Sequence, residues 1–259
     1  MHLKTISTPG LEPTADFPLS LPFIPSIRHI EIENNLLFFV GENGSGKSTL
    51  LESIALTSKR INIGRNELDQ EHSLNEIKPL ASALRLSWQQ RTQKGFFLRA
   101  EDFFGFIRRN QELESEFDGY IDRFKDDDRV RGYMESNKRA INAKYEKDLN
   151  EYSHGEGFLT FFKSRISPGG LYLIDEPEAA LSPQRQLAFA LFVYEMAQQG
   201  CQFIIATHSP IILSTPNSQI WAFSENGIEN SHYDELEHVN FTKNFLQDPA
   251  RYWHQLLKQ

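Results

Sequence analysis

The sequence predicts an α/β domain in which a mixed sheet carries flanking helices, and three segments indicate this. A glycine-rich loop, residues 41–49, stands between the apolar run 36–40 and the helix-like segment 50–56. Two further apolar runs, 171–174 and 202–206, end in polar residues and precede helix-start signals. Short apolar runs alternating with helices are typical of buried parallel strands, and ligands bind beyond the carboxyl ends of such strands.

The glycine-rich loop reads Gly-Glu-Asn-Gly-Ser-Gly-Lys-Ser-Thr and fits the pattern G-x-x-x-x-G-K-[ST]. Its glycines permit backbone angles that point successive N–H groups at a phosphate, and the following helix adds its positive dipole end. We expect Lys47 to reach the β- and γ-phosphates of ATP and the Ser48 hydroxyl to bind Mg²⁺. The expected nucleotide-binding residues of the loop are Asn43, Gly44, Ser45, Gly46, Lys47, Ser48 and Thr49.

Acidic residues end the second apolar run. Asp175 and Glu176 follow Leu171–Ile174, at the edge where ligands bind in an open parallel sheet. We expect Asp175 to contact Mg²⁺ through water and Glu176 to orient or deprotonate the attacking water. His208, which follows the run 202–206, is expected to reach the same site and to hydrogen-bond the γ-phosphate or that water. The predicted catalytic residues are therefore Lys47, Glu176 and His208.

Composition and charge narrow the class of protein. The chain has 259 residues, 27 basic and 35 acidic, and a formal charge of −8. This balance argues against a chain that coats nucleic acid through its overall field, although a local basic patch is compatible with it. No apolar run is long enough to span a bilayer, and a single cysteine, Cys201, fits a reducing cytoplasm and a buried, inert thiol.

The other segments give element-level expectations for a single domain over 1–259. Prolines between 9 and 25 indicate an irregular lead-in, with an edge strand near 17–23. Residues 27–33 are expected to pair with 36–40, and 57–80 are expected to be loop-like. An antiparallel β-hairpin is expected from 84–88 and 96–100, and another from 221–223 and 228–230.

Two regions are expected to be helical. Residues 101–152 are rich in charge and poor in β-branched residues, which indicates an inserted helical lobe with a solvated surface. The tail, 241–259, is expected to form a helix with a Phe, Leu and Trp face. Ser182-Pro183 and Ser209-Pro210 place a capping residue and a proline at the starts of two further helices.

In their order along residues 27–222, these motifs resemble those of the ATP-binding-cassette (ABC) ATPases. The sequences that carry the likeness are the glycine-rich loop, Leu-Tyr-Leu-Ile-Asp-Glu-Pro-Glu-Ala-Ala-Leu-Ser and Ala-Thr-His-Ser-Pro. They look most like the stand-alone AAA_15/AAA_21 ATPases, which are related to the structural-maintenance and recombination-repair ATPase heads. The resemblance implies a P-loop NTPase of the ABC ATPase-head type. It also implies that Glu176 is the catalytic glutamate, His208 the switch histidine and residues 180–183 the loop that crosses to a partner subunit.

Two parts of the family pattern differ here. The segment Tyr-Ser-His-Gly-Glu-Gly, residues 152–157, stands where the resemblance places the signature motif, with Ser153 and Gly155 at its key positions. The same Ser153 and Glu156 also form a capping-box pattern, and both interpretations can hold. The family's metal-contacting glutamine should follow the hairpin, where Gln89, Gln90 and Gln93 lie in the turn and Glu101 at the strand end. Glu101 is the favoured metal residue, beside Ser48 and Asp175, and a nearby glutamine is the alternative.

The resemblance implies a soluble, cytoplasmic ATPase that hydrolyses ATP as a homodimer with two ATP molecules between its chains. Repair, phage defence and regulation of a partner effector all fit, and a partner protein or DNA is compatible with each. One alternative is the ATPase subunit of a membrane transporter, which the altered signature and the long charged lobe argue against. Another is a low-turnover DNA-tethering or assembly module. A nuclease-fused ATPase is disfavoured because only about forty residues follow the His208 region, too few for a further domain.

Overall fold

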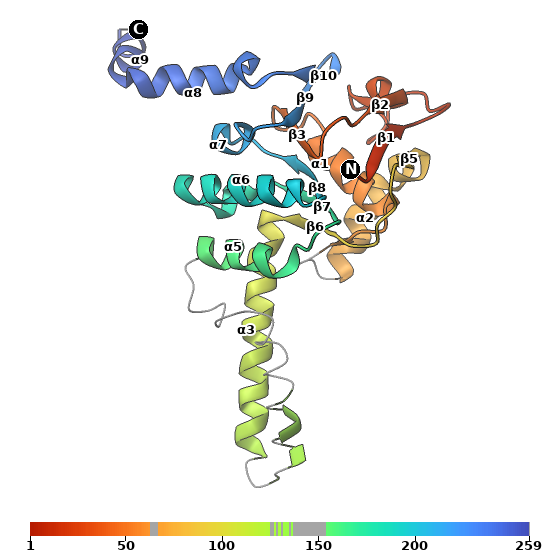
Figure 1. Ribbon diagram of the computed structural model, residues 1–259, viewed down its shortest axis with the longest axis vertical. Coiled ribbons are helices and arrows are strands. Elements are labelled where there is room, and N and C mark those ends of the chain that lie inside the picture. Colours follow the sequence, from red (N-terminus) through yellow and green to blue (C-terminus); the bar gives the residue numbers. More distant parts are fainter. Residues whose placement is uncertain are drawn as a thin grey trace.

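A seven-stranded sheet forms the centre of the molecule, in a computed structural model that describes residues 1–62, 67–124 and 154–258 and seven positions between 127 and 136 (Figure 1). Its strand order is β10-β9-β3-β8-β7-β6-β4, and only the pair β9–β10 is antiparallel. The strands are β3 (Leu36–Gly41), β4 (Ile61–Asn62), β6 (Phe96–Arg99), β7 (Leu171–Asp175), β8 (Gln202–Ala206), β9 (Ser218–Ser224) and β10 (Gly227–Ser231). This confirms the predicted mixed sheet and the hairpin that spans 221–230.

A smaller antiparallel sheet has the order β2-β1-β5, and its strands are β1 (Leu3–Ser7), β2 (His29–Glu31) and β5 (Arg85–Trp88). The predicted hairpin of 84–88 with 96–100 is therefore wrong, because β5 pairs with β1 whereas β6 lies in the main sheet. The patterns of the two strands explain the difference. Polar and apolar residues alternate in β5, as in a sheet with one solvated face, whereas β6 opens with three buried apolar residues, as in a parallel sheet.

Three other local predictions are wrong. Strand β2 is shorter than the predicted strand 27–33 and pairs with β1 rather than with β3, because the 3₁₀ helix η1 (Ile24–Arg28) occupies the residues before it. No strand forms at 17–23. The region 57–80, expected to be loop-like, contains β4 and most of α2 (Glu67–Ala83), whose C-terminal part buries Ile77, Leu80 and Ala81.

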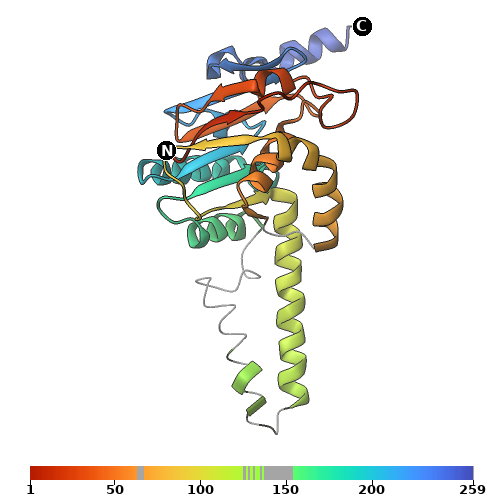
Figure 2. The same ribbon diagram turned by 90° about the vertical axis from the view of Figure 1, so that its right-hand side faces the viewer.

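Helices cover both faces of the main sheet (Figures 1 and 2). One face packs through Phe38, Tyr172 and Phe203 against α5 and α6, and the other packs through Phe39 and Leu173 against α1 and the smaller sheet. The remaining helices are α1 (Lys47–Thr57), α3 (Ala100–Arg123), α5 (His154–Arg165), α6 (Pro183–Gln198), α7 (Pro210–Leu213), α8 (Glu237–Gln247) and α9 (Pro249–Leu256), with the 3₁₀ helices η3 (Pro177–Ala180) and η4 (Tyr233–Glu235).

Helix α3 starts the predicted lobe and extends away from the sheet (Figures 1 and 2). Its base is fixed in the core by Phe103, whose ring centroid lies 4.9 Å from that of Phe158 and 5.4 Å from that of Phe161. Most of the lobe beyond α3, up to residue 152, lies outside the described residues.

The tail forms two helices instead of one. Asp248 ends α8, and its side chain accepts a hydrogen bond of 3.1 Å from the backbone N–H of Arg251, while Pro249 takes the first position of α9. An aspartate cap followed by proline starts a new helix, which the Phe, Leu and Trp pattern alone does not reveal. In the part of the chain that the structure describes, no helix is long and apolar enough to cross a membrane.

Candidate functional site

The loop between β3 and α1 has the backbone that its glycines predict. Gly41 and Gly46 have φ angles of 151° and 94°. Neither position has room for a side chain, because an added Cβ would lie 2.4 Å from the carbonyl oxygen of Phe223 at Gly41 and 2.4 Å from a ring carbon of Phe23 at Gly46. Glycine is therefore required here both for conformation and for packing.

Lys47 lies at the start of α1, with its ammonium turned back over the loop. Nζ donates hydrogen bonds of 2.8 Å to the carbonyl oxygens of Gly41 and Glu42. Burial lowers the pKa of Lys47, and the nearby carboxylates of Glu176, Asp175 and Glu178 partly offset this effect. A mobile, partly desolvated cation held by two carbonyl oxygens can exchange these weak partners for phosphate oxygens.

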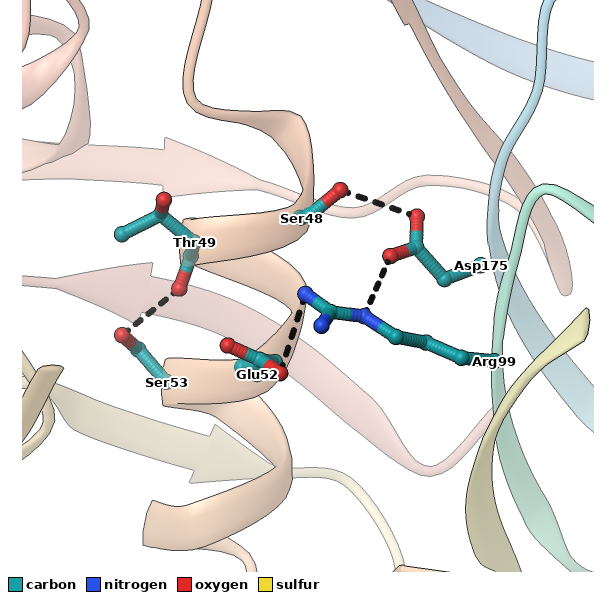
Figure 3. A network of polar contacts seen from close by, with 6 residues as sticks. All are labelled: Ser48, Thr49, Glu52, Ser53, Arg99 and Asp175. Carbon is teal, nitrogen blue, oxygen red and sulfur yellow. Dashed lines mark hydrogen bonds and ion pairs between the residues drawn. The ribbon is translucent and has the colours of Figure 1, made fainter. Parts of the chain in front are cut away.

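The other predicted residues lie in the loop itself and in the first turn of α1. Asn43 and Gly44 are exposed in the loop, and Ser45 donates its backbone N–H to the carbonyl oxygen of Glu42 at 3.3 Å. Thr49 lies in the first turn of α1, where its carbonyl oxygen accepts a hydrogen bond of 2.7 Å from the Ser53 hydroxyl (Figure 3).

Two of the three predicted metal residues, Ser48 and Asp175, contact each other. The Ser48 hydroxyl donates to Oδ1 of Asp175 at 3.1 Å, although 127 residues separate them. Burial raises the pKa of Asp175, whereas Arg99, Ser48 and Lys47 act in the opposite direction. A hydroxyl and a carboxylate beside a phosphate loop are hard oxygen donors of the kind that Mg²⁺ uses together with substrate phosphates, so the residues present fit this ion.

Arg99 is a site residue that the sequence predictions missed. Its Nε donates to Oδ2 of Asp175 at 3.1 Å, and its Nη2 lies 3.0 Å from Oε1 of Glu52 on α1 (Figure 3). Glu101, the predicted metal residue, is exposed in the first turn of α3, and its charge raises the pKa of Glu176. The sequence signal was an arginine at the end of an apolar run, but its register with Asp175 of β7 exists only in the folded sheet.

Glu176 follows β7 with a left-handed backbone, at φ 49° and ψ 51°. Its N–H donates to the carbonyl oxygen of Ala206 at 2.9 Å. Left-handed angles are uncommon for a residue with a side chain and cluster at functional sites. Burial and the charge of Asp175 raise the pKa of Glu176, and Lys47 and Arg99 act in the opposite direction. A carboxylate with a raised pKa is a stronger proton acceptor, which suits a general base.

Glu178 holds the segment that carries His208. Its Oε2 accepts a hydrogen bond of 2.7 Å from the Thr207 hydroxyl, and its Oε1 accepts the backbone N–H of His208 at 2.5 Å. Burial raises the pKa of Glu178, and these two donors counteract the rise. The sequence predictions gave Glu178 no role, although it is the second glutamate of Asp-Glu-Pro-Glu.

Further hydrogen bonds continue from Thr207 to the loop 180–183. The Thr207 hydroxyl accepts the backbone N–H of Ser209 at 3.1 Å, and the Ser209 hydroxyl donates to Oε1 of Gln186 at 2.6 Å. Nε2 of Gln186 then donates to the carbonyl oxygen of Leu181 at 3.0 Å. Side chains therefore connect the loop 180–183 to the segment before α7.

The imidazole of His208 is half-buried, and its buried Nε2 has no hydrogen-bond partner among the residues that the structure describes. Burial lowers the pKa of His208, and the charges of Lys47 and His238 lower it further. His238, at the start of α8, was not predicted near the site. A neutral imidazole with an open nitrogen can accept or donate one hydrogen bond to a ligand.

The predicted signature residues are only partly described. Ser153 lies outside the described residues, and Gly155 falls in the first turn of α5, which begins at His154. Cys201 is buried, as predicted, and its Sγ lies 3.3 Å from the carbonyl oxygen of Ser167.

The chain is similar to several solved structures. A nucleotide-free ATP-binding cassette from an ABC transporter is 16% identical and has a TM-score of 0.50, with 96% of each chain covered. The SMC head domain from Thermotoga maritima is 13% identical, with a TM-score of 0.44 and coverage of 90% of this chain and 99% of that chain. The Smc head domain from Pyrococcus furiosus with an extended coiled coil, bound to the C-terminal domain of ScpA, is 12% identical with a TM-score of 0.48, covering 96% and 99%.

Sequence comparisons identify the family. No curated protein matches the chain. A family model described as "AAA domain, putative AbiEii toxin, Type IV TA system" matches residues 59–214, which include the acids after β7 and His208. This match spans more than half of the chain, and the phosphate loop precedes it. The chain therefore belongs to the AAA_21 family and is a P-loop ATPase with the fold of an ATP-binding cassette.

Proposed function

We propose that this ATPase binds and hydrolyses Mg²⁺-ATP between two copies of the chain. The observation that carries the chemistry is the hydrogen bond between Ser48 and Asp175, because it brings the phosphate loop and the acidic strand end to one edge of the sheet. Lys47 would bind the β- and γ-phosphates there, and Glu176 would take the proton of the attacking water. His208 would offer its open Nε2 to the γ-phosphate or to that water. When bound, Mg²⁺ would neutralise phosphate charge beside Ser48 and Asp175.

The requirement for a second chain is supported by the segment 152–157. His154 is the first described residue of α5, and the capping-box pattern of Ser153 and Glu156 predicts a helix start here, whose unpaired N–H groups and positive dipole end would suit a phosphate. Ser153 and Gly155 lie more than a hundred residues after Lys47, and the family resemblance places such a segment against the γ-phosphate bound by the other chain. Two-fold symmetry would then give the pair two equivalent sites. ATP would bridge the chains, and ADP would release them.

The biological setting that we propose is DNA repair, phage defence or regulation of a partner effector in the cytoplasm. A single buried cysteine fits that compartment. The rival proposal is a transporter subunit, because one similar structure is an ABC-transporter cassette. Two features argue against it. Helix α3 is charged, and the ion pair of Arg99 with Asp175 stands where such a subunit would have a neutral glutamine contact. Capture of partners on the ATP-trapped Glu176→Gln protein, compared with Lys47→Ala, would separate these settings.

Mixing two inactive variants tests the two-chain site. Lys47→Ala removes the phosphate-binding cation, and Ser153→Arg blocks the contact expected from the partner. In a mixed dimer, one of the two sites keeps both Lys47 and Ser153, so phosphate release should reappear on mixing. A matched control mixes Lys47→Ala with Glu176→Gln, both of which disable the same chain's part of a site. Both sites of this mixed dimer stay defective, so no phosphate release should reappear. No phosphate release from the mixture of Lys47→Ala with Ser153→Arg would refute the shared site.

A further inference from the structure

The guanidinium of Arg99 joins two buried carboxylates on different elements. Glu52 is on α1, one turn after Ser48, and Asp175 ends β7, with side-chain exposures of 10% and 5%. Figure 3 shows the guanidinium between them, with Ser48 on the opposite side of Asp175. Both oxygens of Asp175 are therefore held, Oδ1 by Ser48 and Oδ2 by Arg99.

Arginine is suited to this position because its planar guanidinium carries separate N–H donors in a fixed geometry. Nε and Nη2 contact different carboxylates at 3.1 Å and 3.0 Å. A lysine would offer a single point charge and could not fix both partners in the same way. Burying a carboxylate costs less free energy when a cation contacts it, so loss of Arg99 should raise this cost for Glu52 and Asp175 together.

Arg99 lies at the junction of strand β6 and helix α3. It is the last residue of β6 and the residue that precedes α3. Four residues later, Phe103 packs against Phe158 and Phe161. Arg99 and Phe103 thus fix the base of the long helix on two sides, one at the nucleotide site and one in the core.

We propose that Arg99 is a positioning residue that joins the base of α3 to the metal-side carboxylate Asp175 and, through Glu52, to the phosphate-loop helix α1. A displacement of α3 would move the Arg99 side chain and, through its hydrogen bond, shift Asp175 and the Ser48 hydroxyl bonded to it. The reverse also holds, since a ligand that reorients Asp175 would act on the base of α3. The metal-side role of Asp175 rests on the proposed function, whereas the three-element link does not.

The link is tested first without nucleotide, by thermal unfolding of Arg99→Gln, Glu52→Gln and the double variant. Arg99→Gln should lower the Tm by roughly 6–12 °C, because it removes the cation that contacts both buried carboxylates. Adding Glu52→Gln should restore about half of that loss, since one carboxylate is then neutral. Arg85→Gln, on exposed strand β5, is the matched control and should change the Tm by less than about 2 °C. Strictly additive effects of the two substitutions would overturn the link.

Metal-dependent ATP binding tests the positioning role in the folded double variant. Calorimetric titration with ATP should give an affinity within about twofold of the parent when EDTA is present, because Lys47 is intact. The gain in affinity that Mg²⁺ provides should fall by about tenfold, as when the outer partners of a metal-side carboxylate are removed. An unchanged or larger Mg²⁺ gain would show that Arg99 does not position Asp175. A failure of the two-chain model would still allow the Mg²⁺ gain to be compared between variant and parent, because Lys47, Ser48 and Asp175 belong to the same chain.

Discussion

The phosphate-loop side of the site is held by the backbone, whereas the carboxylate side is held by side chains from distant parts of the chain. Lys47 contacts carbonyl oxygens five and six residues away. Asp175, by contrast, is held by Ser48 and Arg99, which are 127 and 76 residues away, and Glu178 reaches Thr207 across 29 residues. We therefore expect ligand binding to depend on a local motif, and the arrangement of the catalytic groups to depend on tertiary contacts.

The largest effect is expected on the phosphate-loop side. Lys47→Ala should lower ATP affinity by at least about 100-fold, because it removes a charge-assisted contact to the phosphates. Its Tm should change little, since Lys47 contacts only two carbonyl oxygens. Calorimetric titration with ATP measures the affinity, with exposed Lys4→Ala as the control. Near-normal binding by Lys47→Ala would mean that the loop is not the nucleotide site.

On the carboxylate side, a substitution should lower stability and leave ATP affinity nearly unchanged. Glu178→Ala should lower the free energy of unfolding by about 2 kcal/mol, because it leaves the Thr207 hydroxyl and the His208 N–H without their acceptor. ATP affinity should stay within about threefold of the parent, while kcat falls as His208 loses its support. Glu178→Gln, which keeps an acceptor, should recover part of both losses. Denaturant unfolding measures the stability and steady-state kinetics measure kcat. A Glu178→Ala variant with the stability and kcat of the parent would show that Glu178 does not support His208.

The smallest effect concerns pH. The pKa values of His208 and His238 are lowered in the folded chain, so the unfolded chain binds more protons below its histidine pKa of about 6.5. Their contribution is therefore full above that pH, and stability is lost as pH falls from about 6.5 toward 5, by at most about 1.4 kcal/mol per pH unit for each group. His208→Asn should flatten this dependence in urea unfolding at pH 7 and pH 5.5, whereas exposed His254→Asn should not. The same slope in His208→Asn and the parent would contradict a buried, neutral His208.

The same contrast explains what could be predicted from the sequence. The phosphate loop, the strands β7 and β8 and the capped starts of α6 and α7 depend on neighbouring residues, and each was predicted with its type and position. Strand β5 was assigned to the wrong partner because pairing with β1 joins residues about eighty positions apart, which no local pattern records. Arg99 and Glu178 were missed for the same reason, since their partners come close only after the sheet has formed.

The prediction that residues 57–80 are loop-like was wrong for a different reason. Helix α2 is polar along most of its sequence and contains Pro79, so its apolar periodicity is weak. Its last turns nevertheless bury Ile77 and Leu80 at the base of α1, and this tertiary packing outweighs the weak helical pattern. Sequence periodicity detects a helix only when its apolar face extends along most of its length.

Light scattering of Glu176→Gln tests the central claim, that ATP joins two chains at a shared site, most directly. This substitution should keep ATP binding and lower turnover by about 10²-fold or more, because it removes the general base. ATP would then persist between the chains. The mass of the particle in solution is measured with Mg²⁺-ATP and with Mg²⁺-ADP at the same protein concentration. The account predicts twice the chain mass with ATP and a single chain with ADP; a single chain under saturating ATP would contradict it.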